Sequence, residues 1–166
     1  MQLKRLRLVF LFVVYSLIAA VNGCKCETQT PLESFCRADW VSHLRVKLRI
    51  TKQPMLDNPL RKGLTNIKYL VHHIRIYKEP PEFSNGTLPV EIFTPSEAPA
   101  CGLMLEAGNE YLLSGSVSEG TLTTLLCGQV LDDDATSRTF ENVLKWSMVS
   151  EKFQQWLDED KSAQCE

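Results

Sequence analysis

The sequence predicts a mainly β fold, a small closed barrel of five strands with short flanking helices and disulfide bonds. Five segments have the composition or alternation of strands, helical patterning is confined to the regions near residues 30 and 150, and the chain contains six cysteines. Five strands followed by a helix favour a closed barrel over a sandwich. A chain of 166 residues is long enough for one domain with a modest core.

Residues 1–23 have the pattern of a secretory signal peptide. A basic start precedes an apolar run and then small residues: Lys4, Arg5 and Arg7, then Leu8–Ala20, then Val21–Gly23. We therefore expect cleavage after Gly23 and a single domain of residues 24–166, secreted to the extracellular space or matrix. The apolar run is shorter than the roughly 20 residues that a spanning helix needs, so no membrane span is expected.

The first element expected in the domain is a short helix. Thr30 is a suitable N-cap, Pro31 suits the first helical position, and Glu33 can close a capping box with Thr30. This short helix is expected to carry Leu32, Phe35 and Cys36 on one face.

The first strand is expected at His43–Ile50, where apolar and polar residues alternate. One face carries Leu44, Val46, Leu48 and Ile50, and the other carries His43, Arg45, Lys47 and Arg49. This pattern predicts a half-buried strand with His43 on the surface. Residues 51–65, rich in turn-forming residues, predict a loop.

Four further strands follow, at Ile67–Lys78, Leu88–Thr94, Glu110–Val117 and Thr121–Val130. A change of parity near His72 and His73 predicts a bulge in the first of these. Ser118–Gly120 is expected to form the turn of a hairpin.

The C-terminal part has helical patterning from Thr139 to Leu157, with two apolar stripes that are rotated against each other. Either two short helices or one bent helix would fit. Asp132–Asp134 is expected to be a solvated loop that caps the following helix. Trp40, Trp146 and Trp156 are expected to pack in the core or under the helices.

All six cysteines follow the signal peptide: Cys24, Cys26, Cys36, Cys101, Cys127 and Cys165. An even count in a small secreted protein implies three disulfides, and the count alone leaves the pairing open. Cys24 would become the N-terminal residue, so its α-amino group and carbonyl oxygen could together bind a metal. A lipidated Cys24 of a bacterial lipoprotein is the alternative, but Val21 and Asn22 fit that cleavage box poorly.

Several landmarks follow Cys24-Lys25-Cys26 in a fixed order: Phe35–Asp39 around Cys36, Val46–Ile50, Tyr69–Lys78, Phe93–Pro95 before Cys101-Gly102, Glu110–Gly115, and Gly120–Leu122 before Cys127. Their order and spacing resemble the N-terminal domain of the tissue inhibitors of metalloproteinases, a netrin-like module with an OB-fold-like barrel. The likeness covers Cys24 to about Val130. It corresponds to a short, invertebrate-like form without the family's cysteine-rich C-terminal domain.

The resemblance implies a secreted inhibitor of zinc metalloproteases, of the matrix metalloprotease or a related class, that acts as a monomer. It implies disulfides Cys24–Cys101, Cys26–Cys127 and Cys36–Cys165, and chelation of the target's catalytic zinc by the amine and carbonyl of Cys24. The protease contacts would be Cys24, Lys25, Cys26, Glu27, Thr28, Ala98, Pro99 and Ala100. The protein would have no cofactor of its own.

Lys25 departs from the small or uncharged residue that the family commonly carries at this position. An ammonium group is costly to bury alone, so Lys25 is expected to weaken inhibition of proteases with closed apolar S1′ pockets. A non-inhibitory netrin-like module, which acts as an extracellular binding or signalling protein, is therefore the alternative function. Lys25 could also be an ordinary solvated lysine.

Other classes of function find little support in the sequence. It lacks the common signatures of zinc proteases, phosphate loops and serine hydrolases, so no enzyme is expected. The net charge of −2, and no basic patch with interleaved aromatics, argue against nucleic acid. The adjacent His72 and His73 point to opposite faces of a strand and are not expected to bind metal together. Asn85 begins the Asn-Gly-Thr glycosylation sequence.

Overall fold

The computed structural model describes residues 24–51, 67–83, 86–132, 143–159 and 164–165. Five strands close into a barrel in the order β1-β2-β3-β5-β4, with β1 at Trp40–Ile50, β2 at Ile67–Lys78, β3 at Glu91–Thr94, β4 at Glu110–Ser118 and β5 at Thr121–Thr123. The pairing of β3 with β5 is parallel and closes the barrel. The predicted five-stranded closed barrel is confirmed.

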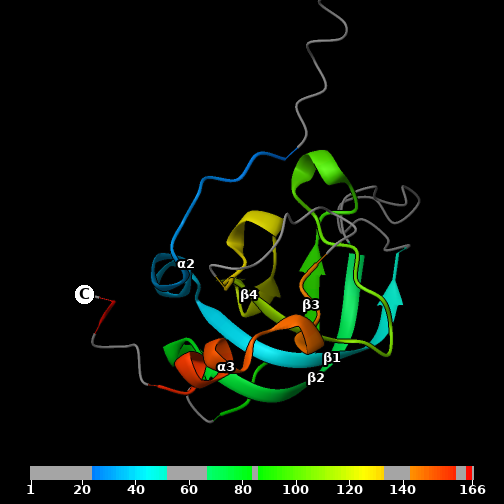
Figure 1. Cartoon of the computed structure of the whole chain (residues 1–166). Coiled ribbons are helices and arrows are strands. Elements are labelled where there is room, and N and C mark those ends of the chain that lie inside the picture. The colour runs from blue at the N-terminus through cyan, green and yellow to red at the C-terminus, as the bar shows by residue number, and fades with distance from the viewer. Residues whose placement is uncertain (1–23, 52–66, 84–85, 133–142, 160–163, 166) are drawn as a thin grey trace, which may run out of the picture.

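Two helices cover the same side of the barrel in Figure 1: α2 at Pro31–Arg37 and α3 at Glu151–Asp158. The capping box predicted for α2 is present, since Thr30 accepts from the Glu33 N–H and the Glu33 carboxylate accepts from the Thr30 N–H. Phe35 of α2 meets Trp156 of α3 edge to face, with ring centroids 5.9 Å apart. Side chains of both helices, among them Phe35 and Phe153, therefore pack together in an apolar cluster outside the barrel.

The barrel interior is filled by large side chains that are almost fully buried, among them Trp40, Tyr69 and Tyr111. The Tyr69 hydroxyl donates to the Leu103 carbonyl at 3.0 Å and accepts from the Leu105 N–H at 2.9 Å. The buried hydroxyl therefore has both partners that its polarity demands. These bonds also hold the segment after Cys101 against the barrel.

β1 and β2 form a long antiparallel pair with irregular register. The bulge predicted near His73 is present, because Ile74 has no partner between the pairs His43–Arg75 and Leu44–His73. The register shifts again at both ends of the pairing, between Val41 and Ser42 and, last, between Val46 and Leu48. This last shift turns Leu48 outward, where 49% of its surface is exposed, so the prediction that Leu48 lies on the same face as Val46 was wrong.

Two predicted strands are shorter than expected. β3 begins at Glu91 rather than Leu88, and β5 ends at Thr123 rather than continuing to Val130. Beyond Thr123 the Gln129 side chain, rather than a strand backbone, bonds to the backbone of Ser114. The hairpin turn is as predicted, with Glu119 and Gly120 both at positive φ, which is typical of a two-residue hairpin loop.

The C-terminal helical region is shorter than its pattern suggested. A 3-10 turn at Trp146–Met148 precedes α3, and Ser150 caps α3 by accepting from the Phe153 N–H. Ser150 also donates to Asp132, so one member of the predicted acidic capping loop does contact the helix start. Asp133, Asp134 and the start of the predicted helix at Thr139 lie outside the described residues.

His43 is buried, with 7% of its surface exposed, and the prediction that it lies on the surface was wrong. The Trp146 ring stacks on its imidazole with centroids 3.8 Å apart. Its Nε2 lies 2.8 Å from the Glu110 carboxylate, which also pairs with Arg45. The C-terminal segment therefore covers a strand position that alternation alone assigns to solvent.

His73 is half-buried in the wall of the barrel. Its Nδ1 lies 2.8 Å from the Ser42 hydroxyl, and its Nε2 lies 3.0 Å from the Pro89 carbonyl. A carbonyl can only accept, so Nε2 carries the proton and Nδ1 accepts from Ser42. Burial lowers the pKa of both His73 and His43, and for His43 the bond to Glu110 opposes this in part.

These two histidines predict a loss of stability in mild acid. Their pKa values in the folded state lie below the unfolded value of 6.5, so unfolding takes up protons as the pH falls below about 6.5. The free energy of unfolding should therefore decrease from pH 6.5 downward, before carboxylates titrate. Urea unfolding of H43Q/H73Q should show a flatter profile between pH 7 and 5. H72Q, at the exposed neighbouring position in β2, is the matched substitution control.

No helix within the described residues is long and apolar enough to cross a membrane.

Candidate functional site

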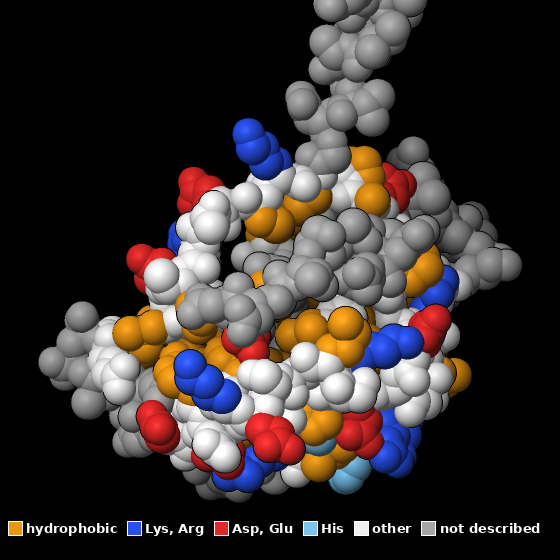
Figure 2. Space-filling model, viewed as in Figure 1, with side chains coloured by type: hydrophobic (Ala, Val, Ile, Leu, Met, Phe, Trp, Pro, Cys, Tyr) orange, Lys and Arg blue, Asp and Glu red, His pale blue; other side chains and the backbone are white. Residues whose placement is uncertain are grey.

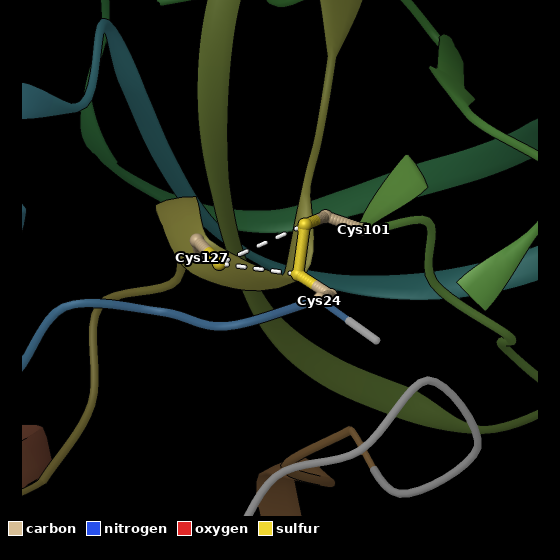
Figure 3. Close-up of side chains that lie close together, drawn as sticks. All are labelled: Cys24, Cys101 and Cys127. Carbon is tan, nitrogen blue, oxygen red and sulfur yellow. Dashed lines mark hydrogen bonds between the residues drawn. A yellow bond between two sulfur atoms is a disulfide. The ribbon is translucent and has the colours of Figure 1, made fainter. Parts of the chain in front are cut away.

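Cys24 is fixed at one edge of the barrel by its disulfide to Cys101 (Figure 3), at a sequence separation of 77 residues. Cys26 is bonded to Cys127, at a separation of 101 residues. The two bridges touch, since the Cys127 Sγ lies 3.3 Å from the Cys24 Sγ. The segment Cys24–Cys26 is thereby tied to the loop between β3 and β4 and to the loop that follows β5.

The third disulfide, Cys36–Cys165, joins α2 to the C-terminal segment at a separation of 129 residues. These three bridges are the pairs that the family resemblance implied, and no cysteine in the described part of the chain is left free. Cys24, Cys101 and Cys127 bring three sulfurs together in Figure 3. All three sulfurs belong to disulfides, so none is the thiolate that a bound metal needs.

The loop that carries Cys101 lies beside the N-terminal segment (Figure 1). Ala98–Ala100 form the 3-10 turn η2, and Cys101 follows in the left-handed conformation with φ of 58°. The Cys101 carbonyl accepts from the Leu126 N–H at 2.8 Å. Both loops bonded to Cys24 and Cys26 are therefore also hydrogen-bonded to each other.

The residues expected to contact a protease form one exposed edge. Cys24 is half-buried, whereas its sequence neighbours and the whole of η2 are exposed: Lys25, Cys26, Glu27, Thr28, Ala98, Pro99 and Ala100. In the space-filling view, hydrophobic side chains at this edge are flanked by charged ones of both signs (Figure 2). The Cys24–Cys101 bridge brings the two expected contact segments together, as their sequence positions alone could not show.

A groove of about 480 Å³ runs behind the N-terminal segment, between α2 and the loop that follows β5. Lys25 and Cys26 line one side of it and Leu125 another. Leu125 has 43% of its surface exposed, although it is apolar and lies two residues before Cys127. Sequence reasoning missed Leu125 as a surface residue because it assigned this stretch to a strand. The sequence signal that points to Leu125 is its place two residues before Cys127, a cysteine expected to be bridged to the N-terminal segment.

Other residues singled out in the sequence lie away from this edge. His72 is exposed while His73 faces Ser42 and Pro89, so the two do not share a site, as expected. Trp40 is buried in the barrel, and Trp146 and Trp156 pack outside it against His43 and Phe153. Asn85 lies outside the described residues.

Comparison with known proteins gives a consistent picture. A family model described as tissue inhibitor of metalloproteinase matches residues 22–151. The chain is 50% identical to the Caenorhabditis elegans protein named "Putative metalloproteinase inhibitor tag-225", over 99% of this chain and 100% of that protein. It is 28% identical to metalloproteinase inhibitor 3 of Xenopus laevis and 27% identical to human metalloproteinase inhibitor 2, over 73% and 82% of this chain. It spans 52% and 61% of those two vertebrate relatives.

Proposed function

Because this chain belongs to the tissue inhibitor of metalloproteinase family, we propose that it is a secreted inhibitor of zinc metalloproteases that acts through the backbone of Cys24. The observation that carries the proposal is the immobilisation of Cys24, by its bridge to Cys101, on an edge where the flanking residues are exposed. We further propose that the signal peptide is removed after Gly23 and that the protein is a monomer without enzymatic activity.

A catalytic zinc in a protease has three protein ligands and one open position that holds water. In the proposed complex the α-amino nitrogen and the carbonyl oxygen of Cys24 would together chelate the zinc and displace that water. The amine has a reference pKa of about 7.7–8, so zinc can compete with its proton near neutral pH. A rigid Cys24 reduces the conformational entropy lost on binding, which favours affinity.

The remaining contacts would come from the exposed edge. Glu27 and Thr28 would extend along the protease cleft on one side of Cys24, and Ala98, Pro99 and Ala100 on the other. Their exposure and the short covalent link through Cys24–Cys101 support this arrangement. The inhibitor would thus fill the cleft as a preformed wedge and bind one protease per molecule.

A second function, a non-inhibitory extracellular binding module of the same fold, is favoured by one observation. Lys25, which follows Cys24 directly, is exposed and would enter the S1′ pocket with its charge. Titration of the secreted protein against a panel of zinc metalloproteases, after sequencing of its N-terminus, separates the two functions. Stoichiometric inhibition by a chain that starts at Cys24 supports the inhibitor, and a different N-terminus would rule out chelation by Cys24.

Lys25→Thr should change which proteases are inhibited. A lone ammonium group is costly to place in an apolar pocket, so its removal should lower the inhibition constant about tenfold or more for proteases with closed apolar S1′ pockets. Proteases with wide, hydrated pockets should change little. The matched control is K152T, because Lys152 is exposed on α3. If K25T and K152T give the same inhibition profile, Lys25 does not determine selectivity.

A further inference from the structure

Beside Cys127, the contact between β4 and the chain that follows β5 is made by side chains rather than by a continuous strand. β4 and β5 pair only as far as Ser116 and Thr123. Beyond that point the Gln129 side chain pairs with the backbone of Ser114, accepting from its N–H at 3.2 Å and donating to its carbonyl at 3.0 Å. The Gln129 amide thus takes the place that the backbone of a longer β5 would occupy.

Ser114 returns the contact with its own side chain. Its hydroxyl donates to the Gly128 carbonyl at 2.7 Å and accepts from the Val130 N–H at 2.8 Å. The Gln129 side chain therefore bonds to the backbone of Ser114, and the Ser114 side chain bonds to the backbone of the two residues that flank Gln129. Ser114 is fully buried and Gln129 is 3% exposed, so neither can exchange these partners for water without local opening.

Thr124 completes the arrangement, which we call the Ser114–Gln129 clamp and define as Ser114, Thr124 and Gln129. The Thr124 hydroxyl donates to the Ser114 carbonyl at 2.7 Å and accepts from the Gln129 amide at 2.8 Å. The same amide nitrogen also lies 2.7 Å from the Leu125 carbonyl, so its two N–H groups are shared among three acceptors. The clamp therefore fixes the backbone on both sides of Cys127, at Leu125 and at Gly128.

The segment held in this way is the one that supports Cys24. Leu126 donates its N–H to the carbonyl of Cys101, the disulfide partner of Cys24, at 2.8 Å. Cys127 contacts the Cys24 sulfur at 3.3 Å and is bonded to Cys26. Leu126 and Cys127 make these contacts, and the residues on either side of them, Leu125 and Gly128, are hydrogen-bonded to the clamp.

From these contacts we infer that the Ser114–Gln129 clamp is a positioning element that sets the place of the Cys24 backbone on the barrel and thereby the affinity for the target zinc. The inference rests on the proposed inhibitory function. The clamp residues are buried and touch no protease; they act through Cys127 and Cys101. Zinc coordination tolerates only small errors in ligand position, so a loop that relaxes costs affinity even when the barrel remains folded.

The test compares two identical substitutions in the same barrel. S114A removes the clamp hydroxyl. S42A removes another fully buried hydroxyl, whose partners are His73 and the backbone of His43 and Arg75, none of them in the segments around Cys24, Cys101 or Cys127. Both variants should lower the melting temperature. Only S114A should raise the inhibition constant, by about tenfold, mainly through faster dissociation.

Thr124 offers a conservative rescue. T124V keeps the shape but loses both hydroxyl bonds, whereas T124S keeps the hydroxyl. T124V should weaken inhibition as S114A does, whereas T124S should keep the wild-type inhibition constant. Equal inhibition constants for wild type, S114A and T124V would overturn the inference, as would an equal loss in S42A.

Hydrogen exchange of the Leu126 amide in the free inhibitor reports on the clamp without any protease. Exchange should be faster in S114A than in S42A when the two are compared at equal global stability. Failure of the wild-type chain to inhibit any zinc metalloprotease would overturn the proposed function. Equal Leu126 exchange in S114A and S42A would overturn the clamp instead.

Discussion

A mature chain with one extra alanine before Cys24 is expected to lose inhibition of zinc metalloproteases by about a thousandfold or more while it remains folded. The alanine converts the Cys24 amine into an amide, whose nitrogen no longer offers a lone pair to zinc. It also places an additional residue where the metal would bind. Loss of ~4 kcal/mol of binding free energy corresponds to that factor.

The experiment compares chains that begin at Cys24 and at the added alanine, using inhibition constants for several zinc metalloproteases and thermal melts. The matched control carries the extra alanine after Glu166 instead. We expect all three chains to melt at the same temperature with the same disulfides, because Cys24 is held through its sulfur and not its amine. Undiminished inhibition by the alanine-extended chain would refute chelation by the Cys24 amine.

The second large effect is expected for Gly102→Ala. A Cβ at this position would lie 1.9 Å from the Pro95 carbonyl oxygen and 2.8 Å from its carbon, both of them backbone atoms that cannot move aside alone. The loop from Pro95 to Cys101, which carries the exposed residues of η2, would have to shift as a whole. Overpacking of this kind costs about 3 kcal/mol, and inhibition should fall with it because Cys101 is displaced.

Gly128→Ala is the matched control for Gly102→Ala. Gly128 also lies directly after a bridged cysteine, but a Cβ there meets no atom within 4 Å. Chemical denaturation should give a change within ~0.5 kcal/mol for G128A and a large loss for G102A. A G102A protein with wild-type stability and wild-type inhibition would show that the Pro95–Cys101 loop can move without consequence for the Cys24 edge.

The barrel could be predicted from the sequence because its three long strands, β1, β2 and β4, show a pattern. Ile67–Lys78 has the predicted bounds, and the cap at Thr30 needs only four neighbouring residues, so local rules decide both. The end of β5 could not be predicted in this way. Residues 124–130 are apolar enough to continue a strand, but in the structure the buried side-chain amide of Gln129, rather than a strand backbone, bonds to the backbone of Ser114.

His43 shows why the surface was harder to predict than the strands. Alternation correctly places its side chain opposite Leu44, on the outside of the barrel. It cannot reveal that Trp146 covers that outer position. The candidate site had the same limit: the pairing of its cysteines came from the family resemblance, and the exposure of Leu125 became visible only with the loop in place.

The long sequence separations of the disulfides determine when, during synthesis of the chain, the segment around Cys24 can be held in place. The residues proposed to reach the zinc are the first of the mature domain to leave the ribosome, yet Cys26 must wait for a partner made 101 residues later. α2, which follows directly, waits 129 residues for the Cys36 bridge. Until Cys101 has emerged, neither Cys24 nor Cys26 has a disulfide partner, and the second bridge must wait for Cys127. The segment around Cys24 is therefore made early but receives its covalent supports late, and a chain interrupted before Cys101 would lack both bridges.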